Sequence, residues 1–533
     1  MTGYVYILLC DDGSYYTGST RDLEQRLEDH FNGEGANYTR KHKPVKLMYF
    51  EEFDRIDEAY YRERQIHGWS KKKKEALIND MPEKIHEYAK CINDTYYKIS
   101  MAKKNGDNVT LASTDAQPAG KQHPECSQRN NSESNNAITM TTFPKLILKR
   151  DKEKSLMRRH PWVFSGAIAK MQGNPQEGDL VEIFSSDGNY LATAHYQDDS
   201  IIAKVIDFNH SAIDENFWTN KFLSAIDYRK RLGFFDFETS HTNVFRLVNG
   251  EGDFMPGLIA DYYNGVLVFQ AHSMGMYKMF PTFANIACKL LGDKVVSIFD
   301  KSSATIPHAT TTDSFIWGEP FDEREICENG NHMLINFFEG QKTGFFVDQR
   351  ENRKLVGNLS SGKRVLNTFG YTGGFSLSAL RGGASYVETV DISKKAIALC
   401  ERNVELNFTN APHKGVAKDV LDYLGTIDNN FDIIILDPPA FAKNHRSLQQ
   451  GLKGYKNINQ KAIEKIKPGG LIFTFSCSQA VSKDDFKTMV FTAAANAHRN
   501  VRIVRQLPHA IDHPVSIYHP EGEYLKGLMI EVE

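Results

Sequence analysis

The sequence predicts an α/β protein of several domains, and three observations lead to this fold class. At about 100–200 residues per domain, the 533 residues correspond to about three or four domains. Hydrophobic residues make up 41% of the chain and charged residues 25%, which is typical of globular proteins. Residues 341–533 alternate short apolar runs with helical patterns, and this alternation predicts a doubly wound parallel sheet.

The composition also argues against several classes of protein. No apolar run reaches the length needed to cross a membrane, and residues 1–10 lack the pattern of a signal peptide. The seven cysteines are odd in number and scattered, which disfavours a disulfide framework. We therefore expect a cytoplasmic protein without a membrane partner. Because the formal net charge is −3, any binding of nucleic acid would depend on local basic patches.

Changes in composition divide the chain into five segments. Residues 1–90 alternate aromatic-rich strands with charged helices, whereas residues 91–141 have too few apolar residues to form a core. We expect this second segment to be a flexible linker. Met140 resembles the natural start of a separate protein, which indicates either a fusion of two stand-alone proteins or an error in the gene model. The ordered patterns that follow divide into residues 142–210, 211–340 and 341–533.

The first segment has the pattern of a small α/β domain. Strands are predicted over residues 4–9 and 15–18, and the Asp-Asp-Gly sequence between them favours a hairpin turn. A helix is predicted over residues 22–30, where Arg26 and His30 lie four residues apart and share one face. A second helix, over residues 56–68, carries Glu63 and is followed by the lysines at 71–74.

These residue types suit the cleavage of a phosphodiester, which needs a base, a cation over the phosphate and a metal held by a carboxylate. Tyr6 and Tyr16 could supply the base and hydrogen bonds, Arg26 the cation and Glu63 the metal ligand. The lysines at 71–74 could follow a phosphate backbone or form a solvated helix end. On spacing alone, an aromatic-cored domain with a solvated basic helix is the favoured interpretation.

The same residues resemble the GIY-YIG nuclease family, in its small stand-alone bacterial branch, over residues 1–85. The first family motif is present as Tyr4-Val5-Tyr6, with Tyr4 in place of glycine, and the second as Tyr16-Thr17-Gly18. The resemblance implies an endonuclease that uses one Mg²⁺ ion, with DNA as a candidate substrate. An inert domain that only binds nucleic acid is the alternative. The arginine, histidine, glutamate and asparagine of the family correspond to Arg26, His30, Glu63 and Asn79.

In the last segment, the residues with distinctive chemistry lie just after predicted strands. The strands end before the glycine-rich turn 369–374, Asp391, Asp437 and Cys477. Ligands of open α/β sheets bind at the carboxyl ends of the strands, so these groups should meet at one edge. Asp391 is placed to accept hydrogen bonds from ribose hydroxyls. The turn lacks the G-x-G-x-x-G pattern, which disfavours a dinucleotide. The predicted strands span residues 364–367, 386–390, 431–436 and 471–475.

Asp437 and Cys477 suggest catalysis at this edge. Two prolines after Asp437 would hold a rigid loop, in which this carboxyl could bind the exocyclic amine of a flipped base beside Phe441. A Cys477 thiolate could attack C6 of a pyrimidine, which makes C5 electron-rich and able to accept a methyl group. The alternative is a cysteine buried in the core. Three other cysteines are assigned to packing, namely Cys288, Cys327 and Cys400.

Residues 142–533 resemble class I S-adenosylmethionine-dependent rRNA methyltransferases of the RlmI type, which form 5-methylcytosine in large-subunit rRNA. The motifs that carry this resemblance are specific and span nearly the whole segment. They are His-Pro-Trp-Val-Phe at 160–164, Arg-Leu-Val-Asn at 246–249, Pro-Gly-Leu at 256–258, residues 340–350 and 369–375, Asp-Pro-Pro at 437–439, Ser-Cys-Ser at 476–478 and Glu-Tyr-Leu-Lys at 523–526.

This resemblance implies S-adenosylmethionine as the cofactor and assigns its site. Asp391 would bind the ribose and Asp419 would lie near the adenine. Many related RNA cytosine methyltransferases carry a second cysteine beside the proline pair, which this chain lacks. Cys477 should therefore work alone, and another group must take the C5 proton. The cofactor side of the site would also include Phe369, Gly370, Tyr371, Gly373, Lys342, Thr343, Asp348 and Arg350.

The resemblance also assigns the other domains. Residues 142–210 would form a PUA β-barrel, residues 211–340 a mixed α/β middle domain that shapes the substrate cleft, and residues 341–533 a Rossmann-like methyltransferase domain. A basic stretch of the PUA domain could contact RNA phosphates or form a solvated edge. This stretch consists of Lys145, Lys149, Arg150, Arg158 and Arg159.

Two other functions stay open for residues 142–533. The Asp-Pro-Pro motif also serves transfer to base nitrogens, so a guanine-N methyltransferase of rRNA is the first alternative. That reaction would not need Cys477 as a nucleophile. An RNA-binding assembly factor with a vestigial site is the second. The expected partner is large-subunit rRNA, and the sequence leaves a homodimer open.

Overall fold

The computed structural model describes residues 3–53, 56–67, 69, 71–79, 143–306, 311–442 and 444–533. The chain divides into two compact units, Met1–Asn135 and Asn136–Glu533. The predicted linker, residues 91–141, lies outside the described residues. Among the helices that are described, none combines the length and the apolar composition that a membrane crossing requires.

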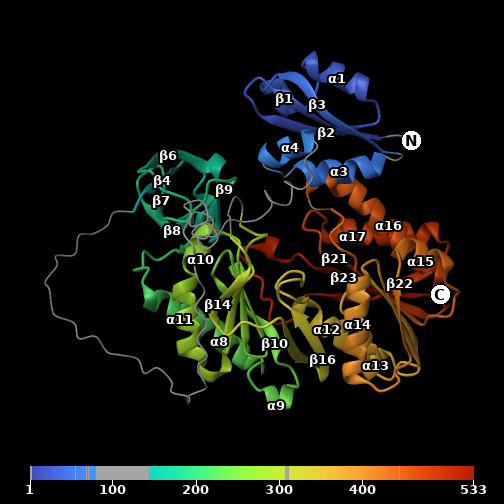
Figure 1. The fold of residues 1–533 in the computed structure, drawn as a ribbon. Coiled ribbons are helices and arrows are strands. Elements are labelled where there is room, and N and C mark those ends of the chain that lie inside the picture. Colours follow the sequence, from blue (N-terminus) through green and yellow to red (C-terminus); the bar gives the residue numbers. More distant parts are fainter. Residues whose placement is uncertain are drawn as a thin grey trace, which may run out of the picture. The chain divides into compact units, whose positions relative to one another are not determined.

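The first unit contains a three-stranded antiparallel sheet in the order β2-β1-β3 (Figure 1). The predicted hairpin and first helix correspond to β1, β2 and α1, and the predicted second helix corresponds to α3. Val5 and Ile7 of β1 pack against Ala59 and Ile66 of α3 to form the core. The elements are β1 (Gly3–Cys10), β2 (Tyr15–Thr20), α1 (Leu23–Phe31), α2 (Asn37–Lys41), β3 (Pro44–Phe53), α3 (Ile56–His67) and α4 (Lys71–Ile78).

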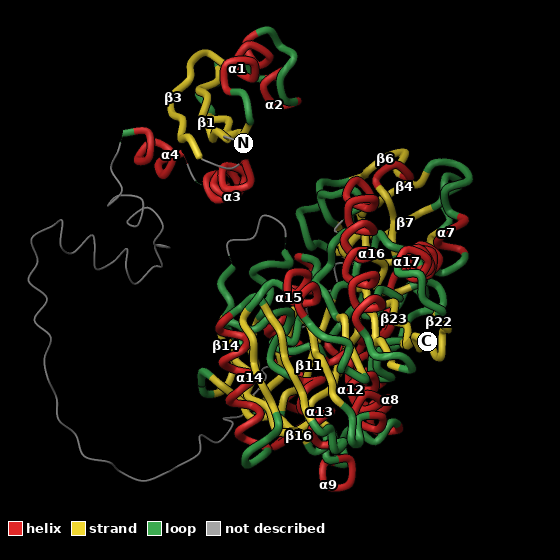
Figure 2. Tube along the Cα trace, turned by 90° about the vertical axis from the view of Figure 1, so that its right-hand side faces the viewer, coloured by secondary structure: helices red, strands yellow, loops and turns green. Residues whose placement is uncertain are grey.

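The second unit begins with a six-stranded sheet in the order β5-β9-β8-β7-β4-β6. Alternate side chains of its strands, such as Val181 and Ile183, share one core with Leu146 and Leu148. Figure 2 shows β4, β6 and β7 together, with the short helix α7 beside them. The elements are β4 (Lys145–Leu148), α7 (Lys154–Met157), β5 (Trp162–Phe164), η1 (Ser165–Ala167), β6 (Ile168–Gln172), β7 (Leu180–Phe184), β8 (Tyr190–Tyr196) and β9 (Ile201–Asp207).

A five-stranded sheet follows, in the order β10-β11-β12-β13-β14, and its two faces have different partners. On one face, Phe245 and Phe269 pack with Trp218 of α8 and Phe283 of α11. On the other face, side chains such as Val268 belong to the core of the C-terminal domain. The elements are α8 (Glu215–Arg231), α9 (Phe237–Ser240), β10 (Val244–Asn249), η2 (Gly250–Asp253), β11 (Leu258–Tyr263), β12 (Val266–Ala271), α10 (Met274–Lys278), α11 (Phe280–Leu291), η3 (Gly292–Lys294), β13 (Ser297–Asp300) and β14 (Ser314–Gly318).

A hairpin made of β15 (Glu323–Glu328) and β16 (Asn331–Asn336) comes before the C-terminal domain in sequence and packs into the same core. Ile326, Met333 and Ile335 of the hairpin lie in this core. A buried bidentate ion pair joins Glu328 to Arg353, at 2.6 and 2.7 Å. The hairpin is therefore structurally continuous with the domain that follows it.

The C-terminal domain is built on a seven-stranded sheet in the order β19-β18-β17-β20-β21-β23-β22. The first five strands are parallel, and β23 is antiparallel to both of its neighbours. Helices α12 to α14 cover one face and α15 to α17 cover the other (Figure 1). This is the predicted doubly wound, Rossmann-like sheet, and the four predicted strands correspond to β17, β18, β20 and β21.

The elements of this domain are η4 (Val347–Gln349), α12 (Arg350–Leu359), β17 (Arg364–Thr368), α13 (Gly374–Arg381), β18 (Tyr386–Asp391), α14 (Lys394–Asn407), β19 (His413–Ala417), α15 (Val420–Thr426), β20 (Ile433–Leu436), η5 (His445–Ser447), α16 (Leu448–Lys465), β21 (Gly470–Ser476), α17 (Lys483–Asn496), β22 (Val501–Leu507), η6 (Pro520–Gly522) and β23 (Lys526–Val532).

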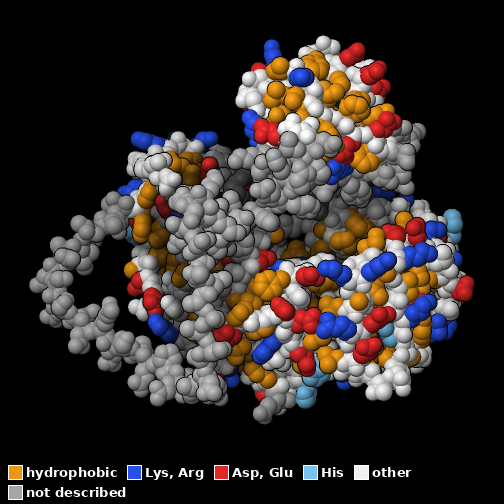
Figure 3. Space-filling view, viewed as in Figure 1, with side chains coloured by type: hydrophobic (Ala, Val, Ile, Leu, Met, Phe, Trp, Pro, Cys, Tyr) orange, Lys and Arg blue, Asp and Glu red, His pale blue; other side chains and the backbone are white. Residues whose placement is uncertain are grey.

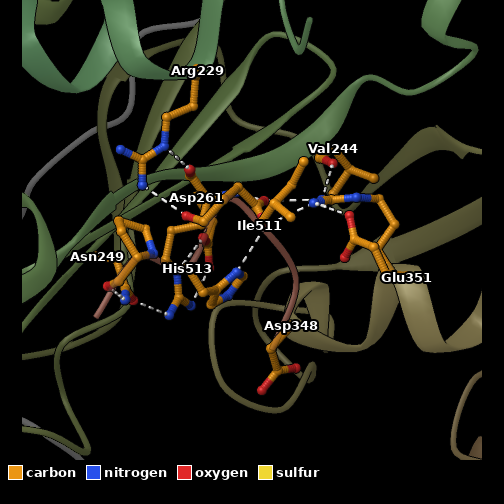
Figure 4. Close-up of polar contacts among 12 residues, drawn as sticks. Arg229, Val244, Asn249, Asp261, Asp348, Glu351, Ile511 and His513 are labelled. Carbon is orange, nitrogen blue, oxygen red and sulfur yellow. Dashed lines mark hydrogen bonds and ion pairs between the residues drawn. The ribbon is translucent and has the colours of Figure 1, made fainter. Parts of the chain in front are cut away.

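A buried ionic network joins the five-stranded sheet to the C-terminal domain (Figure 4). The Asp512 carboxylate accepts hydrogen bonds from both terminal nitrogens of Arg350, at 2.7 and 2.9 Å, and from the Arg246 backbone N–H at 2.7 Å. The Asp512 carbonyl oxygen accepts from Arg229 of α8, at 2.7 Å. Burial alone would raise the pKa of Asp512, but the charges of Arg350 and His513 hold it well below its ordinary value.

Replacing Asp512 by Asn should destabilise the second unit strongly. The substitution leaves the buried Arg350 guanidinium without its counter-charge, and a loss of about 3–5 kcal/mol is typical of a broken buried pair. Urea unfolding of the full chain measures this loss. Because the pKa of Asp512 is depressed in the folded state, the wild type should lose the contribution as pH falls below about 4, whereas the variant should not.

Asp227→Asn is the matched control for this experiment. Asp227 pairs with Lys230 at 3.8 Å and both side chains are exposed, so its replacement should cost less than about 1 kcal/mol. Equal effects of the two substitutions would show that the Asp512 pair does not hold the two sheets together.

Candidate functional site

The glycine-rich turn after β17 and the acid at the end of β18 are directly connected. The Tyr371 N–H donates to Asp391 Oδ2 at 3.1 Å, and the Ser393 N–H donates to Asp391 Oδ1 at 2.9 Å. Phe369 and Tyr371 adopt positive φ angles of 55° and 46° in this turn. Asp419, at the carboxyl end of β19, caps α15 by accepting from two backbone N–H groups. The glycine-rich turn, Asp391 and Asp419 thus lie at one edge of the sheet.

Two glycines of the turn have no room for a side chain. A Cβ on Gly370 would lie 2.3 Å from Thr389 Cγ2, and a Cβ on Gly373 would lie 2.4 Å from Cys400 Sγ. Gly373 also has a φ of 86°, in the left-handed region that favours glycine. The turn is therefore pressed against the sheet, and its open side presents backbone, as a site for a nucleotide-like cofactor requires.

Cys477 lies in a turn that several hydrogen bonds fix. Lys526 pairs with Ser476 across β21 and β23, and its Nζ donates to the carbonyl oxygens of Ser478 at 2.6 Å and Tyr524 at 2.7 Å. The Ser478 hydroxyl accepts from the Ala442 N–H at 3.1 Å. Burial lowers the pKa of Lys526 to about 8. The sequence showed the motif that contains Lys526. It did not predict that Lys526 would hydrogen-bond to the turn that carries Cys477.

Two carboxyl groups of different protonation lie beside Cys477. Burial raises the pKa of Asp437 to about 7, and the charge of Asp348 adds to this effect. Burial also acts on Asp348, but the charge of Lys342, whose Nζ is 2.9 Å away, and a hydrogen bond from Tyr524 keep its pKa well below the ordinary value. Burial raises the pKa of the Cys477 thiol, and the Lys342 charge opposes this.

Gln349 contributes a contact that the sequence did not predict. Its side-chain amide donates to Asp437 Oδ1 at 3.1 Å and accepts from Asn352 at 2.7 Å. Gln349 belongs to the motif at residues 340–350, so the sequence did single out its segment. A glutamine side chain alone does not indicate that it will bond to a carboxyl group.

The side chains of Thr343 and Arg350 hydrogen-bond to carboxylates of the buried network. The Thr343 hydroxyl donates to Asp261 at 2.6 Å and hydrogen-bonds to Tyr263 at 2.8 Å, while Arg350 pairs with Asp512. Both side chains are buried and bonded to this network, so they connect the site to the five-stranded sheet, and their predicted place on the cofactor side stays a prediction.

In the first unit, the structure brings the predicted nuclease residues together. The Tyr6 hydroxyl lies 2.8 Å from His30 Nε2, and His30 Nδ1 lies 2.7 Å from the Thr39 hydroxyl. Tyr16 packs with its ring centroid 5.1 Å from that of His30. Burial raises the pKa of Tyr6 to about 12 and lowers the pKa of His30 to about 4. Arg26 hydrogen-bonds to Tyr6. The charge of Glu63 contributes to the raised pKa values of Tyr6 and Tyr16.

The lysines at 71–74 form the first turn of α4. Lys71 Nζ donates to the Gly13 carbonyl at 3.0 Å, and Lys74 is buried. Gly18 of the second motif is also constrained, because a Cβ there would lie 2.5 Å from the Tyr6 hydroxyl. Asn79 follows α4 and is exposed.

The predicted RNA-contacting stretch lies on the six-stranded sheet and beside it. Lys149, Arg150, Arg158 and Arg159 are exposed, and Lys145 lies over the Phe184 ring at 4.8 Å. On the face drawn in Figure 3, Lys and Arg side chains gather where β4 and β6 lie, whereas basic and acidic side chains are mixed over the C-terminal domain. The basic stretch is thus a local feature of a chain that is nearly neutral as a whole.

Comparisons with known proteins identify three regions. Family models match an S-adenosylmethionine-dependent methyltransferase at residues 246–515, a GIY-YIG catalytic domain at 2–76 and a PUA-like domain at 146–208. The protein named ribosomal RNA large subunit methyltransferase I of Alteromonas mediterranea is 36% identical over 396 residues, which cover 73% of this chain and 98% of that protein. The protein of the same name from Klebsiella pneumoniae is 36% identical over 405 residues, covering 74% of this chain and 100% of that protein.

Solved structures show the same fold for the second unit. A candidate SAM-dependent methyltransferase from Streptococcus mutans is 24% identical, with a TM-score of 0.63, over 73% of this chain and 100% of that chain. A candidate methyltransferase complexed with SAH is also 24% identical, with a TM-score of 0.64 and the same coverage. The predicted combination of α/β folds is therefore confirmed.

Gly373→Ala should weaken the binding of S-adenosylmethionine at least about tenfold, because the new Cβ would displace the turn from Cys400. Gly383→Ala is the matched control. Gly383 has a similar φ of 83°, but a Cβ there would meet its nearest atoms only at 3.8 Å, away from the turn. It should cost about 1–2 kcal/mol of stability and leave cofactor affinity unchanged. Isothermal titration calorimetry distinguishes the two variants, and equal affinities would contradict the role of the turn.

The match to the methyltransferase model covers half of the chain, and the relatives cover nearly three quarters of it. The family match confirms the prediction of an enzyme with S-adenosylmethionine as cofactor. The chain belongs to the S-adenosylmethionine-dependent methyltransferase family, in the group of the large-subunit methyltransferase I relatives, and carries a GIY-YIG catalytic domain at its N-terminal end.

Proposed function

We propose that the second unit methylates C5 of a cytosine in large-subunit rRNA through a covalent adduct with Cys477. The observation that carries this proposal is the position of Cys477 and Asp437 at the carboxyl ends of two paired parallel strands, β21 and β20. They share the sheet edge with the cofactor turn. The name of the relatives and the PUA-like domain support rRNA as the substrate.

The residues at the sheet edge fit S-adenosylmethionine. Gly370 and Gly373 keep the turn free of side chains, Asp391 would accept hydrogen bonds from the ribose, and Asp419 would lie near the adenine. When bound, the cofactor supplies an electrophilic methyl group. The remaining chemistry belongs to the side chains around Cys477.

In the proposed reaction, the Cys477 thiolate forms a bond to C6 of the cytosine. A protonated Asp437, whose pKa is about 7, donates its proton to N3 and neutralises the ring. The electron-rich C5 then takes the methyl group. The C5 proton leaves to a base, the C6–S bond breaks to release the thiolate, and the N3 proton returns to Asp437. The charge of Lys342 favours the thiolate at both ends of this cycle.

Cys477→Ala should reduce methyl transfer by several orders of magnitude, as removal of a catalytic nucleophile does. The affinity for S-adenosylmethionine should stay within about twofold of the wild type, because the cofactor turn is separate. Transfer of a labelled methyl group to rRNA, followed by nucleoside mass spectrometry, measures the rate and identifies the product.

Cys288→Ala, on helix α11 of the middle domain, is the matched control and should keep full activity. Full activity of Cys477→Ala with 5-methylcytidine as product would exclude the covalent mechanism. Formation of a methylguanosine would instead favour the guanine-N alternative, for which Cys477 has no role. Tight binding of RNA by the wild type without any transfer would favour an assembly factor.

We also propose that the first unit is a Mg²⁺-dependent endonuclease that acts on DNA. The hydrogen bond between Tyr6 and His30 supports it, because burial lowers the pKa of His30 and the neutral ring can accept a hydrogen bond from Tyr6, which orients the phenol oxygen. Tyr6 could then activate water, Arg26 would contact the phosphate, and Glu63 would hold the metal. A cytoplasmic location and a homodimer stay predictions.

Glu63→Ala should abolish nicking of supercoiled DNA in the presence of Mg²⁺, because the metal would lose its carboxylate ligand. Glu28→Ala, at an exposed position of α1, should leave nicking unchanged. Agarose-gel separation of nicked and supercoiled plasmid provides the measurement. If the wild type cleaves neither DNA nor RNA, the first unit is an inert nucleic-acid-binding domain.

A further inference from the structure

A cavity of about 470 Å³ in the second unit has no place in the mechanism above. Its lining includes Lys342 and Tyr524, which contact Asp348 beside the candidate reaction centre. It also includes Trp162, from the His-Pro-Trp-Val-Phe motif of the six-stranded sheet, and His519, from the loop before β23. The cavity therefore extends from the neighbourhood of the reaction centre to the PUA-like domain.

Trp162 is held in a fixed orientation at this cavity. Its indole N–H donates to Glu251 Oε1 at 2.8 Å, which joins β5 to the 3-10 helix η2. Its ring centroid lies 4.3 Å from that of His519, with an interplanar angle of 61°. The side chain is half-buried. A large aromatic surface is thus positioned before any ligand arrives.

The ring nitrogens of His519 make no hydrogen bond to any residue that the structure describes. The residue is only 3% exposed. The Glu521 carboxylate lies 3.8 Å from Nε2, within reach of an ion pair but too far for a hydrogen bond. Buried polar atoms almost always have partners, so this ring is suited to receive one from a ligand in the cavity.

The chemistry of the lining favours a nucleobase over a phosphate or an apolar group. The cations of the lining already have partners in the protein, since Arg246 pairs with Asp261, Lys342 with Asp348, and Lys204 donates to the His272 carbonyl. The carboxylates of Glu251 and Glu521 can accept from an exocyclic amine or ring N–H of a base. Aromatic side chains stack on unpaired bases, which is the usual way in which proteins bind single-stranded RNA. The exposed Arg158 and Arg159 precede the motif in sequence and are available for the adjoining phosphates.

We propose that this cavity binds one unstacked base of the substrate RNA, from a nucleotide next to the methylated one, with Trp162 as the stacking surface and His519 and Glu251 as readers of the base edge. The proposal rests on the RNA methyltransferase function proposed above. Cys477 and Asp437 do not line the cavity, which assigns it to a neighbouring base rather than to the target itself.

The experiment uses the full chain and large-subunit rRNA transcribed in vitro, which carries no methyl groups. Trp162→Ala should raise KM for the RNA at least about tenfold, because one stacked base contributes at least that much to binding. The kcat and the affinity for S-adenosylmethionine should stay within about twofold of the wild type. Trp162→Phe, which keeps an aromatic surface, should recover most of the loss.

Glu251→Gln tests recognition of the base edge with little change in shape. The amide oxygen can still accept from the Trp162 indole, but the charge and part of the hydrogen-bonding pattern are changed. We expect KM to rise for the natural RNA and the preference among the bases at one neighbouring position to change. Phe491→Ala is the matched control, since Phe491 is 72% exposed on α17 and does not line the cavity, and it should leave KM unchanged.

Thermal melting shows whether each variant folds. If Trp162→Ala does not fold, the separate variants Trp162→Phe and Glu251→Gln still test the proposal. An unchanged KM in all the Trp162 and Glu251 variants, or a loss confined to kcat, would overturn it. Direct binding of a fluorescent RNA fragment separates this proposal from the methylation proposal. If the wild type transfers no methyl group, weaker binding by Trp162→Ala than by Phe491→Ala still supports the cavity, and equal binding overturns it.

Discussion

The arrangement of the second unit depends on the neutralisation of three buried arginines. Arg229 pairs with Asp253, Arg246 with Asp261 and Arg350 with Asp512, and all three guanidinium groups are nearly inaccessible. Burying a guanidinium costs several kcal/mol unless a carboxylate lies beside it. The Asp512 carboxylate also accepts from the Arg246 backbone N–H, and the Asp512 carbonyl oxygen accepts from Arg229, so one residue connects all three arginines. Removal of one partner of this network would leave an uncompensated charge buried between the five-stranded sheet and the C-terminal domain.

The segment from Lys342 to Arg350 connects that network to the reaction centre. Thr343 and Arg350 bond to Asp261 and Asp512 in the network, while Lys342 and Gln349 contact Asp348 and Asp437. In these nine residues, some side chains bond to the network between the domains and others bond to the carboxyl groups of the site. A disturbance of the network should therefore reach the site through this short segment, without any direct contact between Asp512 and Cys477.

The sequence was sufficient for the parts of the fold that depend on local patterns. Strands β17, β18, β20 and β21 are buried on both faces, so they form continuous apolar runs, and the groups that follow them meet at one edge because the strands are parallel. Arg350 could not be placed in this way. Its partner, Asp512, lies 162 residues away, and no local pattern distinguishes an arginine in a buried pair from one that binds a ligand. The same holds for Lys526, whose role depends on the antiparallel pairing of β23 with β21.

Burial, together with the charges of Lys342 and Asp348, shifts the pKa values of the candidate reaction centre. Lys342 stabilises the negative charge of Asp348 at 2.9 Å, and that charge, together with burial, raises the pKa of Asp437. Lys342 also opposes the effect of burial on the Cys477 thiol. The Lys342 ammonium group thus favours the ionised Asp348 and opposes the rise in the pKa of Cys477, whereas burial and the Asp348 charge outweigh it at Asp437. A covalent attack on a cytosine needs a proton donor for N3 and a nucleophile for C6, and near neutral pH an isolated aspartate would not supply the proton.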